Sequence, residues 1–182
     1  MGIVVHEFIS LDGVYEDPRW TFEFPVDPRM FEAVGAATAR SKAILLGRRT
    51  YEMFYPAWST RTAEDDPGAP FFNETPKYVV SSTLENPEWN NSTVLGPYDP
   101  DAIRSLKEQV DGDVYVSGSG TLVRAMLADG LVDELVLLMF PVALGSGERL
   151  FAEGGPATKL ALTETEAYDS GVVRLSYGPA TD

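Results

Sequence analysis

Three short runs of small, hydroxyl-bearing and cationic residues in this sequence have the composition that binds phosphate. Each run directly follows an apolar, β-branched stretch. The runs are Gly-Arg-Arg-Thr at 47–50, Ser-Ser-Thr at 81–83 and Gly-Ser-Gly-Thr at 118–121. Guanidinium groups, hydroxyls and the free N–H groups at the start of a helix are the donors that hold phosphate oxygens in proteins. The runs therefore indicate an anion site built from separate parts of the chain.

Taken one at a time, these runs remain ambiguous. The dinucleotide fingerprint would need a third glycine after Gly118 and Gly120 at the place of Val123, and the phosphate-binding pattern Gly-Lys-Ser/Thr is missing. The glycine run could be only a tight turn, and Arg48 and Arg49 could belong to a solvated surface. Together the runs carry more weight, because the carboxyl ends of parallel strands meet at one edge of a sheet, where ligands bind.

Strands and helices alternate along the chain and must position these runs. Apolar runs predict strands at 3–9, 42–47, 77–82, 92–96, 113–118 and 134–144, followed by a hairpin of 159–168 and 172–177. Apolar faces of helical period predict helices at 28–40, 48–56, 100–110 and 120–129. The sequence thus predicts one α/β domain over residues 1–182: a single mixed, mostly parallel sheet flanked by helices, with a C-terminal antiparallel hairpin.

Local signals set the ends of several predicted elements. Asp27-Pro28 and Asp99-Pro100 each combine an N-cap with proline at the first helical position. Residues 59–76 are rich in Pro, Gly and Asp and show no sustained period, so we predict mostly loop there. Pro141 within the last apolar strand indicates an edge or a bulge, and the apolar length of that strand suggests pairing in a homodimer.

Composition excludes several classes of function. The 182 residues include no cysteine and one histidine, which removes thiol catalysis and zinc sites rich in Cys or His, so we expect no metal. A formal charge of −14 argues against a nucleic-acid surface. No apolar run approaches the roughly 20 residues that cross a membrane, and the start lacks the features of a signal peptide. We expect a cytoplasmic protein.

Five segments in order, covering nearly the whole chain, carry a family resemblance. They are "FISLDGVYEDP", "LLGRRTYE", "KYVVSSTLEN", "DVYVSGSGTLVRAMLADGLVDELVLLMFPVALGSGERLF" and the final hairpin. In these segments the chain resembles the dihydrofolate reductase-like fold. It is most similar to the branch with the C-terminal reductase domain of the bifunctional riboflavin-biosynthesis deaminase-reductase and its stand-alone relatives.

The resemblance implies an NADPH-dependent oxidoreductase that transfers a hydride to a small heterocycle, pteridine-like or riboflavin-precursor-like. It implies three groups of cofactor-binding residues: Gly47, Arg48, Arg49 and Thr50 beside the phosphates, Ser81, Ser82 and Thr83 near the adenosine 2′-phosphate, and Gly118, Ser119, Gly120 and Thr121 around the pyrophosphate. Dihydrofolate reductases carry a pterin-binding acid at a position that falls near Phe31 here, with Glu32 one residue away, and the zinc deaminase signature is missing. The alternative is an NADPH-binding module without turnover.

The loop after the first strand supplies the candidates on the substrate side. By the resemblance, Asp12 faces the nicotinamide region and could hydrogen-bond a substrate as the catalytic group, although Asp-Gly is also a common turn pair. Trp20, with Tyr15 and Phe22, could form an aromatic platform under a flat ring, or could simply pack the loop down. We predict that His6, inside a strand, is a core residue.

Overall fold

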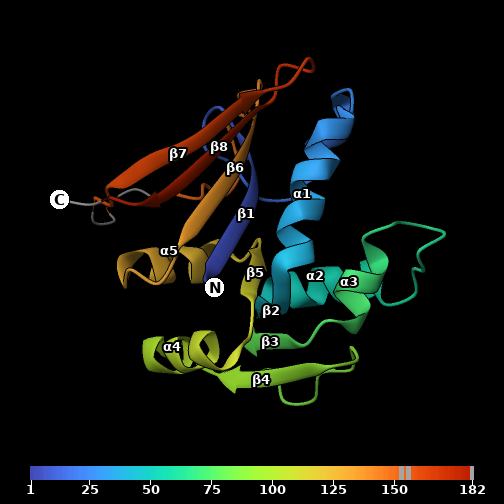
Figure 1. The fold of residues 1–182 in the computed structure, drawn as a ribbon, viewed down its shortest axis with the longest axis vertical. Helices are drawn as coiled ribbons and strands as arrows, with labels where there is room; N and C mark the ends of the chain where they lie inside the picture. The colour runs from blue at the N-terminus through green and yellow to red at the C-terminus, as the bar shows by residue number, and fades with distance from the viewer. Residues whose placement is uncertain (152–153, 155–156, 181–182) are drawn as a thin grey trace.

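The computed structural model describes residues 1–151, 154 and 157–180. Within this range the strands form one eight-stranded mixed sheet in the order β4-β3-β2-β5-β1-β6-β8-β7 (Figure 1). The strands are β1 Ile3–Ser10, β2 Ser41–Gly47, β3 Lys77–Val80, β4 Ser92–Gly96, β5 Asp113–Ser117, β6 Glu134–Phe140, β7 Leu160–Ala167 and β8 Val173–Pro179. The helices are the 3-10 helix η1 Pro18–Glu23, and α1 Pro28–Arg40, α2 Arg48–Trp58, α3 Ala69–Glu74, α4 Pro100–Gln109 and α5 Gly120–Ala128.

The pairing of the strands confirms the predicted fold. The first six strands pair in parallel, and β8 then pairs antiparallel with both β6 and β7. Since six parallel strands point the same way, their carboxyl ends lie at one edge of the sheet. The three predicted phosphate-binding runs follow β3, β2 and β5, which are neighbours in the sheet.

Helices cover both faces of the sheet and bury its central strands. α4 and α5 pack on one face, where residues such as Ile103 and Met126 join the largest core cluster. α1, α2 and α3 pack on the other face, where Ala37, Tyr51 and Phe72 contact the sheet (Figure 1). Coverage on both sides explains why the central strands are continuous apolar runs and lack the alternation of a half-exposed strand.

The predicted helix starts are confirmed, whereas several predicted ends differ: α2 extends to Trp58, and β3 and β5 end at Val80 and Ser117. Asp27 and Asp99 each accept a hydrogen bond from the main-chain N–H two residues on, at 3.0 and 2.9 Å. Residues 59–76, predicted to be mostly loop, also contain α3, a six-residue helix too short to show a period in the sequence. β6 ends at Phe140 and does not extend to 144, because Pro141 has no N–H to donate to a neighbouring strand.

Packing, which the local sequence does not reveal, holds α3 in place. The ring of Phe72 stacks on Trp58 at 4.3 Å between ring centres. Lys77 is fully buried, and its ammonium donates hydrogen bonds to the carbonyl oxygens of Phe72 at 2.8 Å and Thr75 at 2.9 Å. These bonds satisfy carbonyl groups at the end of α3 that have no partner within the helix.

Candidate functional site

The sheet has a switch point between β1 and β5. The last pair of residues joining these strands is His6 and Ser117, whereas β1 remains paired with β6 as far as Ser10. The connection after β1 leads to α1 on one face, and the connection after β5 leads to α5 on the other (Figure 1). Open α/β sheets bind ligands where neighbouring strands part in this way.

A chain of hydrogen bonds joins the ends of β2 and β5 beside this switch point. The Ser119 hydroxyl accepts a hydrogen bond from the N–H of Gly47 at 2.7 Å and donates one to the Thr50 hydroxyl at 2.7 Å. Gly118 and Ser119 both have φ of 68°, in the left-handed region, which turns the chain sharply into α5. The structure therefore brings two of the three predicted phosphate-binding runs into contact.

The start of α5 offers unused hydrogen-bond donors. Among the described residues, none accepts a hydrogen bond from the main-chain N–H groups of Ser119, Gly120 or Thr121. Free N–H groups at a helix start favour an anion. Arg48, at the start of α2, lies on the same edge and pairs with Glu52 one turn further on at 3.3 Å.

Glu148, from the chain after β6, forms ion pairs with two arginines near these donors. Its carboxylate lies 3.0 Å from Arg124 and 3.6 Å from Arg49, which is 84% exposed. Its hydrogen bond with Arg124 is the main reason that the pKa of Glu148 is lowered, and Tyr15 also hydrogen-bonds to it. Tyr15 covers Gly120 so closely that a Cβ there would lie 2.3 Å from the phenol oxygen. An anion at the start of α5 would compete with Glu148 for both arginines.

The third run, Ser-Ser-Thr, is divided between a turn and the surface. The Ser81 hydroxyl accepts hydrogen bonds from the N–H groups of Thr83 at 3.1 Å and Leu84 at 2.9 Å, so it shapes the turn after β3. The side chains of Ser82 and Thr83 are exposed. Only these two members of the run have hydroxyls that the turn leaves available.

Asp12 holds two loops together. Its carboxylate accepts hydrogen bonds from the Ser10 hydroxyl at 2.6 Å and from the N–H groups of Leu144 at 3.0 Å and Gly145 at 2.8 Å. The Ser10 bond and then the two main-chain bonds lower the pKa of Asp12 to about 2. Because both oxygens already accept hydrogen bonds, the contacts favour the turn interpretation of Asp12 over the catalytic one.

Main-chain hydrogen bonds reinforce this connection between the loop at 11–17 and the loop at 141–151. The bonds run in both directions: Leu11 N–H to the Val142 carbonyl at 2.8 Å, Leu150 N–H to the Gly13 carbonyl at 2.9 Å, and Tyr15 N–H to the Glu148 carbonyl at 3.1 Å. The two loops thus form one hydrogen-bonded unit over the ends of β1 and β6.

The aromatic side chains of the first loop do not form the predicted platform. Trp20 packs edge-on against Phe140 at 5.5 Å between ring centres, in the cluster on the α1 face. Tyr15 belongs to the cluster on the α5 face, and Phe22 is 85% exposed. The rings cannot act as one surface because the chain carries them to different sides of the sheet.

Glu7 is a residue of the site that the sequence interpretation missed. It lies directly after the last β1/β5 pair, is 4% exposed, and has one carboxylate oxygen, Oε1, with no hydrogen-bond partner among the described residues. Burial raises the pKa of Glu7 to about 8, against a hydrogen bond from the main chain at Gly118 that lowers it. The available signal was one acidic residue inside the apolar run Ile-Val-Val-His-Glu-Phe-Ile.

His6 is buried on the opposite face, as the prediction of a core residue required. Its ring stacks on Tyr115 at 6.3 Å and meets Phe8 edge-on. Burial lowers the pKa of His6 to about 4, so the ring is neutral at physiological pH. A neutral ring facing the α1 side has no proton to give at the start of α5.

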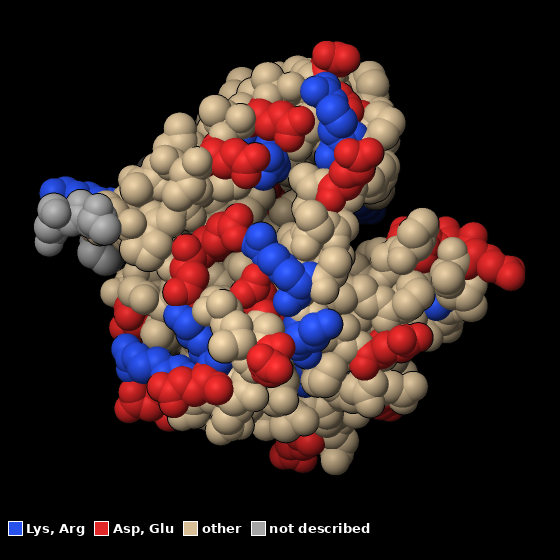
Figure 2. Space-filling view, in the orientation of Figure 1, with Lys and Arg blue, Asp and Glu red and all other residues tan. Residues whose placement is uncertain are grey.

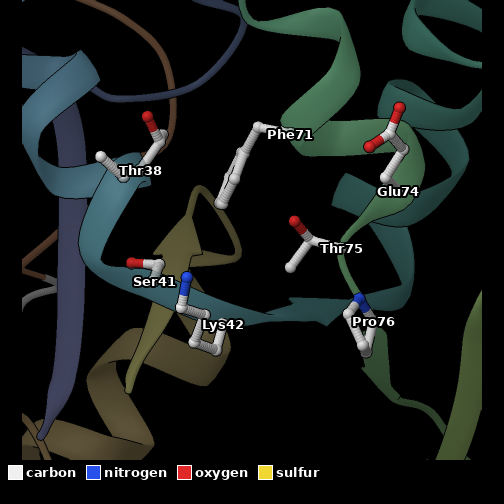
Figure 3. Close-up of a pocket in the computed structure, with 8 residues that line it drawn as sticks. Thr38, Ser41, Lys42, Phe71, Glu74, Thr75 and Pro76 are labelled. Carbon is white, nitrogen blue, oxygen red and sulfur yellow. The ribbon is translucent and has the colours of Figure 1, made fainter. Parts of the chain in front are cut away.

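Two hollows among the described residues lie away from the switch point. Figure 3 shows one of them, lined by Ser41, Lys42 and Phe71, at the amino ends of β2 and β3. No set of three or more metal-ligating side chains occurs in residues 1–151, 154 and 157–180. No helix in that range has the length and apolar character to cross a bilayer. Figure 2 shows acidic and basic side chains interspersed over the face in view, with no single basic patch.

The fold and its switch point belong to the dihydrofolate reductase-like class. A dihydrofolate reductase from Enterococcus faecalis, solved in complex with NADP(H), superposes with a TM-score of 0.63 at 14% identity, over 97% of this chain and 95% of that one. More specifically, the chain belongs to the RibD C-terminal domain family, whose family model matches residues 2–174.

The chain is also similar to other proteins of known sequence or structure. The protein YyaP of Bacillus subtilis (strain 168) is 25% identical over 179 residues, 96% of this chain and 93% of YyaP. A putative riboflavin biosynthesis protein from Shewanella sp. PV-4 has a TM-score of 0.79 at 22% identity, with both chains covered fully. A deaminase/5-amino-6-(5-phosphoribosylamino)uracil reductase from Thermotoga maritima has a TM-score of 0.67 at 17% identity, over 98% of this chain and 56% of that one.

Proposed function

We propose that this protein is an NADPH-dependent reductase that transfers a hydride to a small heterocyclic substrate. Membership of the RibD C-terminal domain family supports a reductase role. The observation that carries the proposal is the set of hydrogen bonds among Gly47, Thr50 and Ser119. These bonds join two of the predicted phosphate-binding runs beside the switch point. The alternative function is an NADPH-binding module without turnover.

The donors at this edge fit the phosphates of a dinucleotide. The free N–H groups of Ser119, Gly120 and Thr121 would hold the pyrophosphate. Arg48 and Arg49, at the start of α2, would add charge-assisted hydrogen bonds. When bound, NADPH would supply the hydride, and the protein would contribute binding, orientation and a proton.

The exposed hydroxyls of Ser82 and Thr83 would contact the adenosine 2′-phosphate, which distinguishes NADPH from NADH. Both residues lie at the end of β3, next to β2 in the sheet, and their side chains take no part in the turn that Ser81 stabilises. This arrangement supports a preference for NADPH.

On the substrate side, Trp20 remains the candidate for contact with a flat ring that lies beyond the strand ends at the switch point, where it can be reached from both faces of the sheet. Trp20 lies with Phe8, Phe24 and Phe140 on the α1 face at the ends of β1 and β6. The Thermotoga maritima relative is named as a 5-amino-6-(5-phosphoribosylamino)uracil reductase, which supports a pyrimidine-derived substrate here. A folate is less favoured, because the position of the pterin acid falls near Phe31, which is 66% exposed, and the neighbouring acid Glu32 is also exposed.

Calorimetric titration of NADPH and NADH into the free protein tests this proposal. We expect NADPH to bind at least about tenfold more tightly, a difference of about 1.4 kcal/mol. Ser82→Glu places a negative charge near the 2′-phosphate and should remove that preference while the protein stays folded, since Ser82 is exposed. Ser105→Glu, on the exposed side of α4, is the matched control and should bind NADPH as the wild type does.

Oxidation of NADPH with a panel of pteridines, deaminated aminopyrimidines and flavin-like rings then separates the two functions. Turnover with any member establishes a reductase. Tight binding of NADPH without oxidation across the panel would instead establish the binding module. Equal affinity for NADPH and NADH in the wild type would contradict the assignment of Ser82 and Thr83.

A further inference from the structure

Glu7 is a buried carboxyl group placed at the switch point. It faces the α5 side of the sheet in line with Val5 and Ile9, which are both core residues of that face. β1 and β5 pair as far as His6 and Ser117, so Glu7 is the first residue of β1 beyond the last pair. An acidic side chain at this position of a buried strand has a high desolvation cost, which a purely structural role would not require.

The surroundings of Glu7 do not balance a negative charge. No described residue forms an ion pair with it, and Oε1 has no hydrogen-bond partner among the described residues. The groups that face it are the main chain at Gly118 from the turn after β5 and Tyr15 from the loop after β1. Tyr115 of β5 lies on the other face of the sheet, where it stacks on His6. None of these is a cation. A carboxyl group in such surroundings keeps its proton at neutral pH.

The other titratable groups near the ends of β1 and β5 are poor proton donors. Asp12 is held ionised by three hydrogen bonds, and its pKa is lowered to about 2, mainly by Ser10. His6 lies on the other face, and burial lowers its pKa to about 4. Burial, with a smaller effect of Glu148, raises the pKa of Tyr15 to about 12. Glu7 combines a proton at neutral pH with an oxygen that no group in the described part of the chain hydrogen-bonds.

On this basis, and resting on the proposed reductase function, we propose that Glu7 is the proton donor of the reduction. The hydride adds to the carbon of a C=N or C=O bond of the heterocycle, and the π electrons of that bond move to the nitrogen or oxygen. This atom takes the proton from Glu7, so the O–H bond of the carboxyl group breaks and a new N–H or O–H bond forms. The remaining carboxylate then takes a proton from water.

The first test measures the proton directly in the free protein. Infrared difference spectroscopy between pH 6 and pH 9 should show the loss of one protonated carboxyl band in the wild type, with a midpoint near pH 8. The band should be missing in Glu7→Gln and present in Glu108→Gln, an exposed position on α4. A wild type without this band has an ionised Glu7, which would overturn the proposal.

The second test compares turnover and binding in the same variants. With a substrate from the panel, Glu7→Gln should lower kcat about 100-fold or more and leave the dissociation constant of NADPH within about threefold, since general acid catalysis contributes that range. The wild-type rate should fall above about pH 8, and the residual rate of Glu7→Gln should not. Glu108→Gln should match the wild type throughout.

The outcomes separate failure of this inference from failure of the reductase function. A wild type that binds NADPH but reduces nothing in the panel overturns both proposals. A wild type that turns over, with Glu7→Gln equally active, overturns the proton donor and leaves the reductase function standing. If Glu7→Gln does not fold, two measurements still test the proton donor. They are the carboxyl band of the wild type and the kcat of Glu7→Asp. Glu7→Asp moves the carboxyl group back by one methylene but keeps its proton. It should therefore lower kcat less than Glu7→Gln does.

Discussion

Replacing Glu7 by glutamine should stabilise the free protein increasingly as the pH rises. In the unfolded chain the carboxyl group ionises near its ordinary pKa of 4.5, whereas in the folded protein it keeps its proton up to about pH 8. Between these values the folded state binds more protons than the unfolded state, so wild-type stability falls as the pH rises through this window. Glutamine is nearly isosteric and does not titrate, so the variant lacks this loss.

The size of the effect follows from the shift in pKa. A rise in the pKa of Glu7 from 4.5 to about 8 lowers the free energy of unfolding by ~5 kcal/mol between low pH and about pH 8. Above about pH 8 this loss is complete. About half of this loss, ~2.5 kcal/mol, falls between pH 6 and pH 9. His6 acts in the other direction: its pKa is lowered from 6.5 to about 4, so it reduces stability as the pH falls from 6.5 through 4. Because both proteins contain His6, their difference isolates Glu7.

Urea unfolding at pH 6 and pH 9 checks this reasoning. The free energy of unfolding of Glu7→Gln minus that of the wild type should increase by roughly 2.5 kcal/mol between the two pH values, with unchanged m-values. Glu108→Gln, whose side chain makes none of the described hydrogen bonds or ion pairs, should follow the wild type. A constant difference across the pH range would show that Glu7 is ionised in the folded protein, and would refute the argument.

Two further predictions concern the loops around the switch point. Asp12→Asn turns an NH₂ group toward main-chain N–H donors. We therefore expect the Tm in thermal unfolding to fall by roughly 3–6 °C. A reduced kcat at an unchanged Tm would restore a catalytic role for this residue. Gly120→Ala places a methyl group against the Tyr15 ring and should cost about 1–3 kcal/mol. Tyr15→Leu should recover at least about 1 kcal/mol of that loss in a double-mutant cycle, and additive effects would show that the two side chains do not meet.

The sequence could predict the sheet edge because its signals were local and repeated. Each of the runs at 47–50, 81–83 and 118–121 follows an apolar strand, and parallel strands bring such ends together whatever their order in the sheet. The sequence could not show that Ser81 would use its hydroxyl for the turn, since Ser-Ser-Thr has the same composition in either role.

The substrate side was harder to predict because it depends on the path of a loop. Tyr15 and Trp20 are five residues apart, yet they pack on opposite faces of the sheet, and no periodic pattern in an irregular loop gives that result. The partners of Asp12, Leu144 and Gly145, are more than 130 residues away in the chain. Glu7 interrupts the apolar strand at 3–9, and a buried acid among apolar residues is the type of position where function overrides stability.

The hydrogen-bonded unit of the loops at 11–17 and 141–151 has a consequence for kinetics. Each loop supplies donors to the other, so neither can leave its place without breaking bonds of both. Movement of the chain above the switch point is therefore one cooperative event with a single rate. Tyr15 and Glu148 belong to that unit, and both lie at the start of α5. Any molecule that must displace them to enter or leave would share one rate-limiting barrier, which places arrival and departure on the slower timescale of loop motion.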